Sequence, residues 1–279
     1  MEANKVNAGS GAQWLLDGIA LVRRHPGPLL VIGLVYGVLA SIPVLSLLVG
    51  ALGVVLMGGV LLAVRQADQG QSPGVATLFA AFGSGKIARL LVLVLIAVVF
   101  MLAVALLLVL MIGGEGVSLM QRIVESTPPG GQPDPALIAQ LPAGRLLGWF
   151  ALLLVLAVLV GVYTFFYIAL VMFTDLGAGQ ALRASMKAGT RNLPALLVYM
   201  LVSIVFSVMV MLLVALVSGL LGIALGGFWA ELLAGVLVTM VVVPVSAGAM
   251  YYGWRQVFGD RLPGAPPPLP EDTGSGFHA

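Results

Sequence analysis

Hydroxyl-bearing side chains recur inside the apolar stretches of this 279-residue sequence, where a polar group needs a partner. Two pairs are spaced four residues apart and so share a helix face. Ser246 follows Pro244, which has no N–H and leaves the carbonyl of Met240 without its helical partner. We predict a polar layer that lines a cytoplasm-facing cavity for a headgroup or small molecule, or that hydrogen-bonds helices together. Its candidate residues are Tyr36, the pair Tyr163 and Tyr167, the pair Tyr199 and Ser203, and Ser246.

Basic residues recur along residues 175–192, a stretch with helical periodicity. Arg183, Lys187 and Arg191 are spaced four residues apart and share one face of the predicted helix, while Leu182 and Met186 lie on another. A helix of this kind binds anionic lipid at a bilayer surface, with about 1 kcal/mol per basic residue. We therefore predict that these three side chains contact anionic headgroups.

Groups that could carry out catalysis or bind a metal are scarce. The sequence has no cysteine, and its two histidines stand far apart at positions 25 and 278. Gly83-Ser84-Gly85-Lys86 is similar to the end of a phosphate-binding loop, but Ile87 follows where such a loop has Ser or Thr. Glu231, beside Trp229, could serve a proton or cation path or could mark the outer interface. We predict no enzymatic activity and no cofactor.

The composition is that of a membrane protein. Hydrophobic residues make up 61% of the chain and charged residues only 9%, whereas soluble domains carry about a quarter charged residues. A surface so poor in charge suits lipid rather than water. The net charge of +2 gives no indication of nucleic-acid binding. The predicted fold is all-α, a polytopic transmembrane helix bundle.

The apolar segments predict six spans. Residues 29–64 contain no charge, and as one helix they would be about 54 Å long, against a hydrocarbon core of about 30 Å. The chain must therefore turn back between Pro43 and Gly53, as two full spans or as a re-entrant pair. The predicted spans are residues 28–46, 50–67, 90–112, 147–173, 194–218 and 229–254.

The remaining segments divide the chain into three parts. Residues 1–27 form a predicted cytoplasmic segment with an interfacial helix from Trp14 to Arg24, and Trp14 is expected at headgroup depth. Residues 28–257 form the six-span domain, with a further interfacial helix after Ser72-Pro73. Residues 258–279 are a predicted disordered cytoplasmic tail. A signal peptide cleaved near Ala40 is the alternative for the N-terminus, although apolar sequence continues past that residue.

The distribution of basic residues predicts the orientation. With both termini in the cytoplasm, only Arg122 and Arg145 lie outside. Such a bias is typical of a bacterial-type inner membrane protein, and a single span over residues 29–64 would destroy it. The eleven inside residues, of thirteen basic ones, are Lys5, Arg23, Arg24, Arg65, Lys86, Arg89, Arg183, Lys187, Arg191, Arg255 and Arg261.

Small residues predict where helices approach closely. Gly33 and Gly37 are spaced four apart, as are Ser218, Gly222 and Gly226, which suits packing within the chain or between two copies. We therefore expect membrane lipids as partners, with a homo-oligomer or another membrane protein as a further partner. The predicted function is lipid or partner association without catalysis; the alternative is a transporter of a small molecule or lipid.

Two stretches suggest relationships within and beyond the chain. Residues 24–31 align without gaps over residues 191–198, which favours a parallel duplication or a chance similarity of apolar sequence. Residues 12–257 resemble a group of uncharacterised bacterial inner-membrane proteins, similar in pattern to the membrane domain of glycerophosphodiester phosphodiesterases. The resemblance implies a six-helix membrane domain and no activity or site residues. It rests on Gln180-Ala181-Leu182-Arg183-Ala184-Ser185 followed by Asn192.

Overall fold

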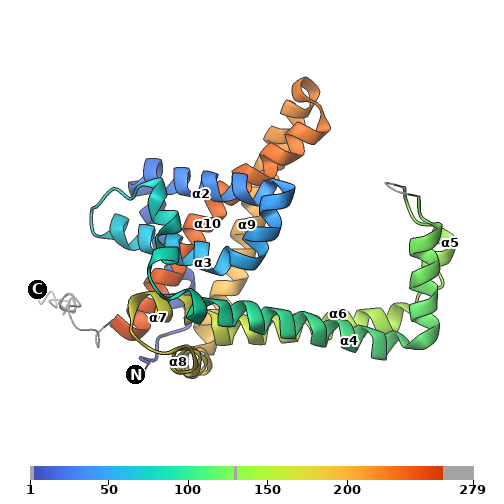
Figure 1. Cartoon of the computed structure of the whole chain (residues 1–279), viewed down its shortest axis with the longest axis horizontal. Helices are drawn as coiled ribbons and strands as arrows, with labels where there is room; N and C mark the ends of the chain where they lie inside the picture. The colour runs from blue at the N-terminus through green and yellow to red at the C-terminus, as the bar shows by residue number, and fades with distance from the viewer. Residues whose placement is uncertain (1–2, 129–130, 260–279) are drawn as a thin grey trace, which may run out of the picture. The chain divides into compact units, whose positions relative to one another are not determined.

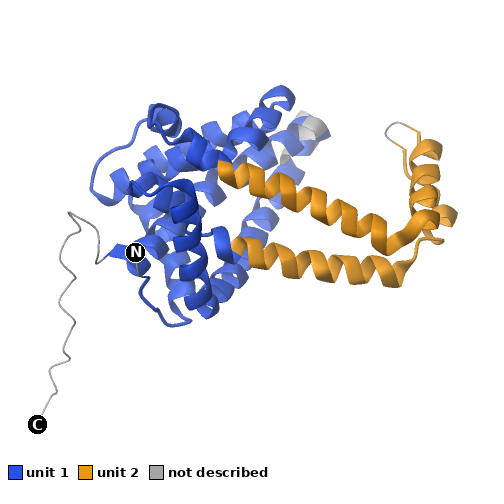
Figure 2. Ribbon diagram, turned by 60° about the horizontal axis from the view of Figure 1, so that its bottom comes forward, with its two compact units in different colours: residues 1–91, 162–279 blue, residues 92–161 orange. Residues whose placement is uncertain are grey.

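The computed structural model describes residues 3–128 and 131–259, and over these residues the regular structure is helical (Figure 1). It divides into two compact units: one holds the described residues up to 91 and from 162 onward, and the second holds residues 92–161 (Figure 2). The elements are α1 (Ser10–Arg24), α2 (Pro26–Ser41), α3 (Pro43–Asp68), η1 (Val75–Gly83), α4 (Ile87–Ser126), α5 (Pro135–Ile138), α6 (Ala143–Thr164), α7 (Tyr167–Phe173), α8 (Ala178–Arg191), α9 (Leu193–Leu225) and α10 (Gly227–Phe258).

Five segments among the described residues are long and apolar enough to cross a membrane. These segments are Pro43–Asp68, Ile87–Ser126, Ala143–Phe173, Leu193–Leu220 and Trp229–Phe258. A sixth arises if α1 and α2, which meet at a bend of 106°, are counted as one broken span. The helical, multi-pass class is therefore confirmed, and the count of six spans remains a prediction.

Prolines and glycines set most helix ends. Pro43 begins α3 directly after Ile42, so α2 ends at Ser41 rather than near residue 46 as predicted. The turn between α9 and α10 is at Gly226, whose φ of 84° suits a residue without Cβ. Gly219 and Gly222 lie inside α9, which continues to Leu225, while the candidate span Leu193–Leu220 ends close to the predicted residue 218. Glycine inside a membrane helix allows close approach of a neighbouring helix.

One predicted span is interrupted, and another is followed by a kink. Gly113, with φ of 71°, kinks α4 just beyond the predicted end of the third span at residue 112, and the helix then continues to Ser126. The predicted fourth span is broken between Thr164 and Tyr167, which separates α6 from α7. Tyr163 and Tyr167 therefore lie on two consecutive helices, and not on one helix as their spacing predicted.

Helix α1 packs against protein. The side chain of Trp14 is 1% exposed, so protein covers it, and its position at headgroup depth remains a prediction. Its indole N–H donates to Gln256 at 2.6 Å, and its ring lies beside Phe165 and Phe166. The apolar face of this amphipathic helix thus meets other helices.

Glycine contacts hold α1 and α2 against α10. Gly18 faces Gly248, and a Cβ on Gly18 would lie 2.6 Å from the carbonyl oxygen of Val245. A Cβ on Gly33 would lie 2.3 Å from the carbonyl oxygen of Met240, the group released by Pro244. Gly33 and Gly37 therefore serve packing within the chain, the first of the two predicted uses.

Small side chains also dock α8. Ala181, Ser185, Ala188 and Gly189 are buried, so the packed face is made of small residues, and Met186 is exposed. In η1, which follows Ser72-Pro73, Leu78 is buried while Val75 and Phe79 are exposed.

The second unit consists of most of α4, α5 and most of α6, with apolar side chains largely exposed. The indole of Trp149 donates to the carbonyl of Val104, and Arg145 donates to that of Ile112. Charged residues of the predicted outer loop, Glu115, Arg122 and Arg145, line a hollow of about 340 Å³ beside the kink.

The end of the chain is partly described. Phe258 is buried and ends α10, so the predicted disordered tail does not begin at residue 258. The rest of that predicted tail, with Arg261, lies outside the described residues.

Candidate functional site

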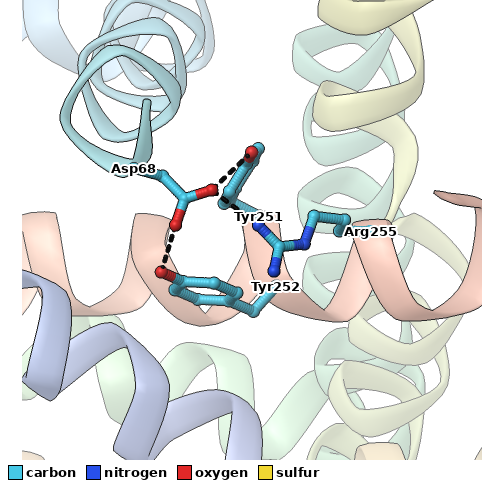
Figure 3. A network of polar contacts seen from close by, with 4 residues as sticks. All are labelled: Asp68, Tyr251, Tyr252 and Arg255. Carbon is cyan, nitrogen blue, oxygen red and sulfur yellow. Dashed lines mark hydrogen bonds and ion pairs between the residues drawn. The ribbon is translucent and has the colours of Figure 1, made fainter. Parts of the chain in front are cut away.

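A carboxylate at the end of α3 gathers three side chains from the end of α10 (Figure 3). Asp68 Oδ2 accepts from Arg255 at 2.6 Å and from the hydroxyl of Tyr251 at 3.1 Å, while Oδ1 accepts from Tyr252 at 2.6 Å. The side chain of Asp68 is 14% exposed and that of Arg255 is 47% exposed. Three donors to one carboxylate fix the two helix ends to each other.

Aromatic rings surround this ion pair. The Arg255 guanidinium lies 5.1 Å from the ring centroid of Tyr252, and Arg65 lies 5.2 Å from that of Phe173. Phe173 packs in turn on Trp254, with centroids 4.7 Å apart. Aromatic and basic side chains in this combination are typical of a membrane–water interface.

Asn192 joins the N-terminal segment to the α8–α9 junction. Its side chain is fully buried. The amide oxygen accepts from the backbone N–H of Val6 at 2.8 Å, and the amide nitrogen donates to the carbonyls of Asn4 and Ala188. The backbone N–H of Asn4 also donates to Val257 at the end of α10. One side chain thus ties an extended segment to two helix ends.

Cations at the start of α4 bind the carbonyl groups that end α7. Lys86 Nζ donates to Met172 and Thr174, each at 3.0 Å, and Arg89 donates to Leu176 at 3.2 Å. Burial lowers the pKa of the Lys86 ammonium, an effect that Asp175 opposes and Arg89 reinforces. Cations are favourable at this end of a helix, because its last carbonyls lack partners.

These contacts bring together the connections that the charge pattern assigns to one side of a membrane. They join the N-terminal segment, the end of α3, the start of α4, the segment after α7, the α8–α9 junction and the end of α10. We call this set the connector face. The chain therefore returns to the same face after α2–α3, after α4–α7 and after α9–α10.

The six residues of the predicted polar layer do not all make the same kind of contact. The Tyr199 hydroxyl lies near those of Ser203 and Ser246, although Ser203 Oγ is buried and has no hydrogen bond of good geometry. Tyr167 instead donates to the carbonyl of Arg89.

The other two tyrosines of the predicted layer, Tyr163 and Tyr36, lie on α6 and α2. The backbone carbonyl of Tyr163 accepts from Ser185 at 2.7 Å. Tyr36 approaches Gly53 across the α2–α3 hairpin. The structure thus joins Tyr199, Ser203 and Ser246, and a common cavity for all six remains a prediction.

The basic residues of α8 lie on the exposed side of this helix. Arg183, Lys187 and Arg191 are exposed, while the opposite face of the helix is docked through Ser185. Met186, on the exposed side, is 41% exposed. Basic and apolar groups are therefore presented together.

The structure reveals partners that were missed in the sequence. Asp68 bonds to side chains more than 180 positions away, and no spacing pattern indicates such a contact. The position of Asp68 at the end of an apolar run was the one signal in the sequence that could have indicated its role. Within residues 3–128 and 131–259, no group of three metal-ligating side chains is found.

No protein-family model, curated protein or solved structure matches this chain. The resemblance to the membrane domain of glycerophosphodiester phosphodiesterases therefore remains a prediction. Of the residues that carry it, Ala181, Ser185 and Asn192 are buried contacts. Gln180 accepts from the N–H of Gly177 at the start of α8. These positions have structural roles in this chain.

Proposed function

We propose that this chain is a multi-pass inner-membrane protein whose connector face lies in the cytoplasm and binds anionic lipid headgroups. Three helical hairpins enter the membrane from that face and return to it, the first as two full spans or as a re-entrant pair. Both termini would then be cytoplasmic, in keeping with the bias of basic residues.

The observation that carries the lipid proposal is the exposed side of α8. The exposed side of α8 carries the basic residues Arg183, Lys187 and Arg191, which take no part in docking this helix. They lie beside the exposed side chain of Met186. Leu193 and Leu197, at the start of α9, are also exposed. In an interfacial helix, apolar side chains enter the lipid and neighbouring cations contact the phosphate groups. A helix with both features prefers anionic lipid.

We expect the triple variant Arg183→Gln, Lys187→Gln, Arg191→Gln to lose roughly tenfold or more in affinity for phosphatidylglycerol, since each cation contributes about 1 kcal/mol before salt screening. Binding would be measured by lipid titration of the protein in nanodiscs of neutral lipid. The matched control replaces both arginines with lysine, which keeps the charge and should keep the affinity. Equal affinity in the glutamine variant would refute lipid binding by α8.

Transport of a small molecule or lipid is a second candidate function. It is favoured by the buried, unpaired hydroxyl of Ser203 beside Tyr199 and Ser246, because a buried polar group of this kind is satisfied by a polar ligand at low cost. These three residues lie on α9 and α10, close to the connector face end of α9.

The variant Tyr199→Phe tests this second function, because it removes one hydroxyl and keeps the ring that packs on Phe165. If the hydroxyl contacts a transported ligand, uptake by reconstituted vesicles should fall severalfold while the free energy of unfolding stays within about 1 kcal/mol. Unchanged uptake together with lowered stability would assign the hydroxyl to helix packing. Ser218→Ala, in the outer half of α9, is the control.

A further inference from the structure

The hollow beside the kink of α4 is lined by charged side chains from two segments of the second unit. One is the part of α4 beyond its kink, where Glu115, Ser118 and Arg122 are spaced three and four residues apart and so share a helix face. The other segment contributes Gln140 and Arg145. With a volume of about 340 Å³, the hollow is large enough for a small polar group.

The hollow lies at the end of two helical segments that contain no charged residue, 90–114 and 146–174. From Leu90 to Ile112 the helix is about 34 Å long, enough to cross a hydrocarbon core of about 30 Å. The Arg145 guanidinium donates to the carbonyl of Ile112 at 3.4 Å, so the two segments end at the same level. The hollow is therefore at headgroup depth when this hairpin spans a membrane.

The part of α4 beyond the kink has the pattern of an interfacial helix. Figure 1 shows that it turns sharply away from the first part of α4. Its polar face lines the hollow, whereas Met120 and Val124, on the opposite face, are 38% and 74% exposed. Charged side chains on one face and exposed apolar ones on the other suit the boundary between headgroups and hydrocarbon. This pattern gives the same depth for the hollow as the length of the uncharged segments does.

The charged groups of the hollow are available to a ligand. Glu115, Arg122 and Arg145 are exposed. Across the described part of the chain, the side chains of Glu115 and Arg122 make no hydrogen bond or ion pair, and Arg145 donates to a backbone carbonyl only. Both arginines belong to the predicted outer loop, where basic residues are disfavoured. Two such residues nevertheless line one hollow.

These groups fit a headgroup that carries both a phosphate and a primary ammonium. Guanidinium groups donate paired N–H bonds to phosphate oxygens, and the Glu115 carboxylate can accept from the ammonium. A trimethylammonium has no N–H to donate, and a glycerol headgroup has no cation for the carboxylate. We propose that the hollow binds the headgroup of phosphatidylethanolamine. The site goes beyond the proposed function, because it is separate from α8 and takes a different lipid.

The variants Glu115→Gln and Arg122→Gln test the site, because neither removes a side-chain contact within the described part of the chain. Glu125→Gln is the matched control, since this exposed carboxylate lies on the same segment and does not line the hollow. Native mass spectrometry of the full chain in detergent would give the affinities for dioleoyl phosphatidylethanolamine and dioleoyl phosphatidylcholine. Calorimetry would give the affinity for phosphoethanolamine, which has the same polar groups and no acyl chain.

We expect the unchanged protein to bind phosphatidylethanolamine about fivefold more tightly than phosphatidylcholine. Glu115→Gln should abolish this preference and leave the phosphatidylcholine affinity unchanged, whereas Arg122→Gln should weaken the binding of both lipids by about fivefold.

No preference in the unchanged protein would overturn the proposal, as would a preference that survives Glu115→Gln or is lost in Glu125→Gln. Phosphoethanolamine binding as tight as that of the lipid would assign the hollow to a soluble ligand and overturn the lipid assignment. The glutamine variant of α8 should keep the preference for phosphatidylethanolamine and lose affinity for phosphatidylglycerol only. Failure of one site is therefore distinguishable from failure of the other.

Discussion

Replacing Gly18 with leucine should lower the free energy of unfolding by about 3 kcal/mol. Even a Cβ at this position would lie 2.6 Å from the Val245 carbonyl oxygen and 2.9 Å from the backbone nitrogen of Ala249. Backbone atoms cannot move aside as a flexible side chain can, so α1 must shift away from α10. The shift also removes Trp14 from its aromatic neighbours. Unfolding in mixed micelles, followed by tryptophan fluorescence, measures the loss.

Gly27→Leu is the matched control, because no atom outside its own helix turn lies within 4 Å of a Cβ at Gly27. This variant should change the free energy of unfolding by no more than about 0.5 kcal/mol. A Gly18→Leu protein as stable as the control would mean that α1 is not docked on α10. The helix would then be interfacial, as its amphipathic pattern first indicated.

The second large effect is expected for Asp68→Ala, which should cost about 2 kcal/mol. The substitution leaves the hydroxyls of Tyr251 and Tyr252 and the guanidinium of Arg255 without their common acceptor. Because the Arg255 side chain is 47% exposed, it can turn to water, and the loss stays below that of a fully buried pair. Chemical unfolding in detergent gives the difference in free energy.

Asp17→Ala provides the comparison for this loss, since the Asp17 carboxylate accepts from Gln13 on an exposed helix face. We expect about 0.5 kcal/mol or less for this change. In a double-mutant cycle, Asp68→Ala and Arg255→Gln should be strongly non-additive. Additive effects would show that the pair seen in Figure 3 contributes nothing to joining α3 and α10.

The class of fold could be predicted from composition, because a chain with 9% charged residues cannot cover a water-facing surface. Helix ends could be predicted where proline begins a helix, as at Pro43. The break after Thr164 could not, because residues 165 and 166 are both phenylalanine and contain no breaking residue. At that break Phe166 packs on Trp14 of α1, a tertiary contact that no local pattern indicates.

The orientation of amphipathic helices was the main point that periodicity left open. A hydrophobic face indicates burial but does not say whether protein or lipid covers it. Trp14 meets protein, whereas Met186 stays exposed because α8 docks through the smaller Ala181 and Ser185. Small residues count little in a hydrophobic pattern, yet they permit the closest approach between helices.

The residue types of the candidate site could be predicted from the sequence, but the contacts between its residues could not. The spacing of Tyr199 and Ser203 predicts that both lie on one face of their helix, and in the structure the Tyr199 hydroxyl lies near those of Ser203 and Ser246. The carboxylate of Asp68 and its three donors come from segments that are brought together by the packing of α3, α7 and α10. No local pattern contains that information.

The central position of α10 has a consequence for biogenesis. Helices α1, α2, α3, α7 and α9 all contact it, and α1 and α2 do so through glycines fitted to its backbone. A ribosome synthesises α10 after every one of these partners. The contacts of these helices with α10 can therefore form only after α10 has been synthesised, and the unit is incomplete until then. Chains that stall before residue 227 should be substrates for membrane quality-control proteases.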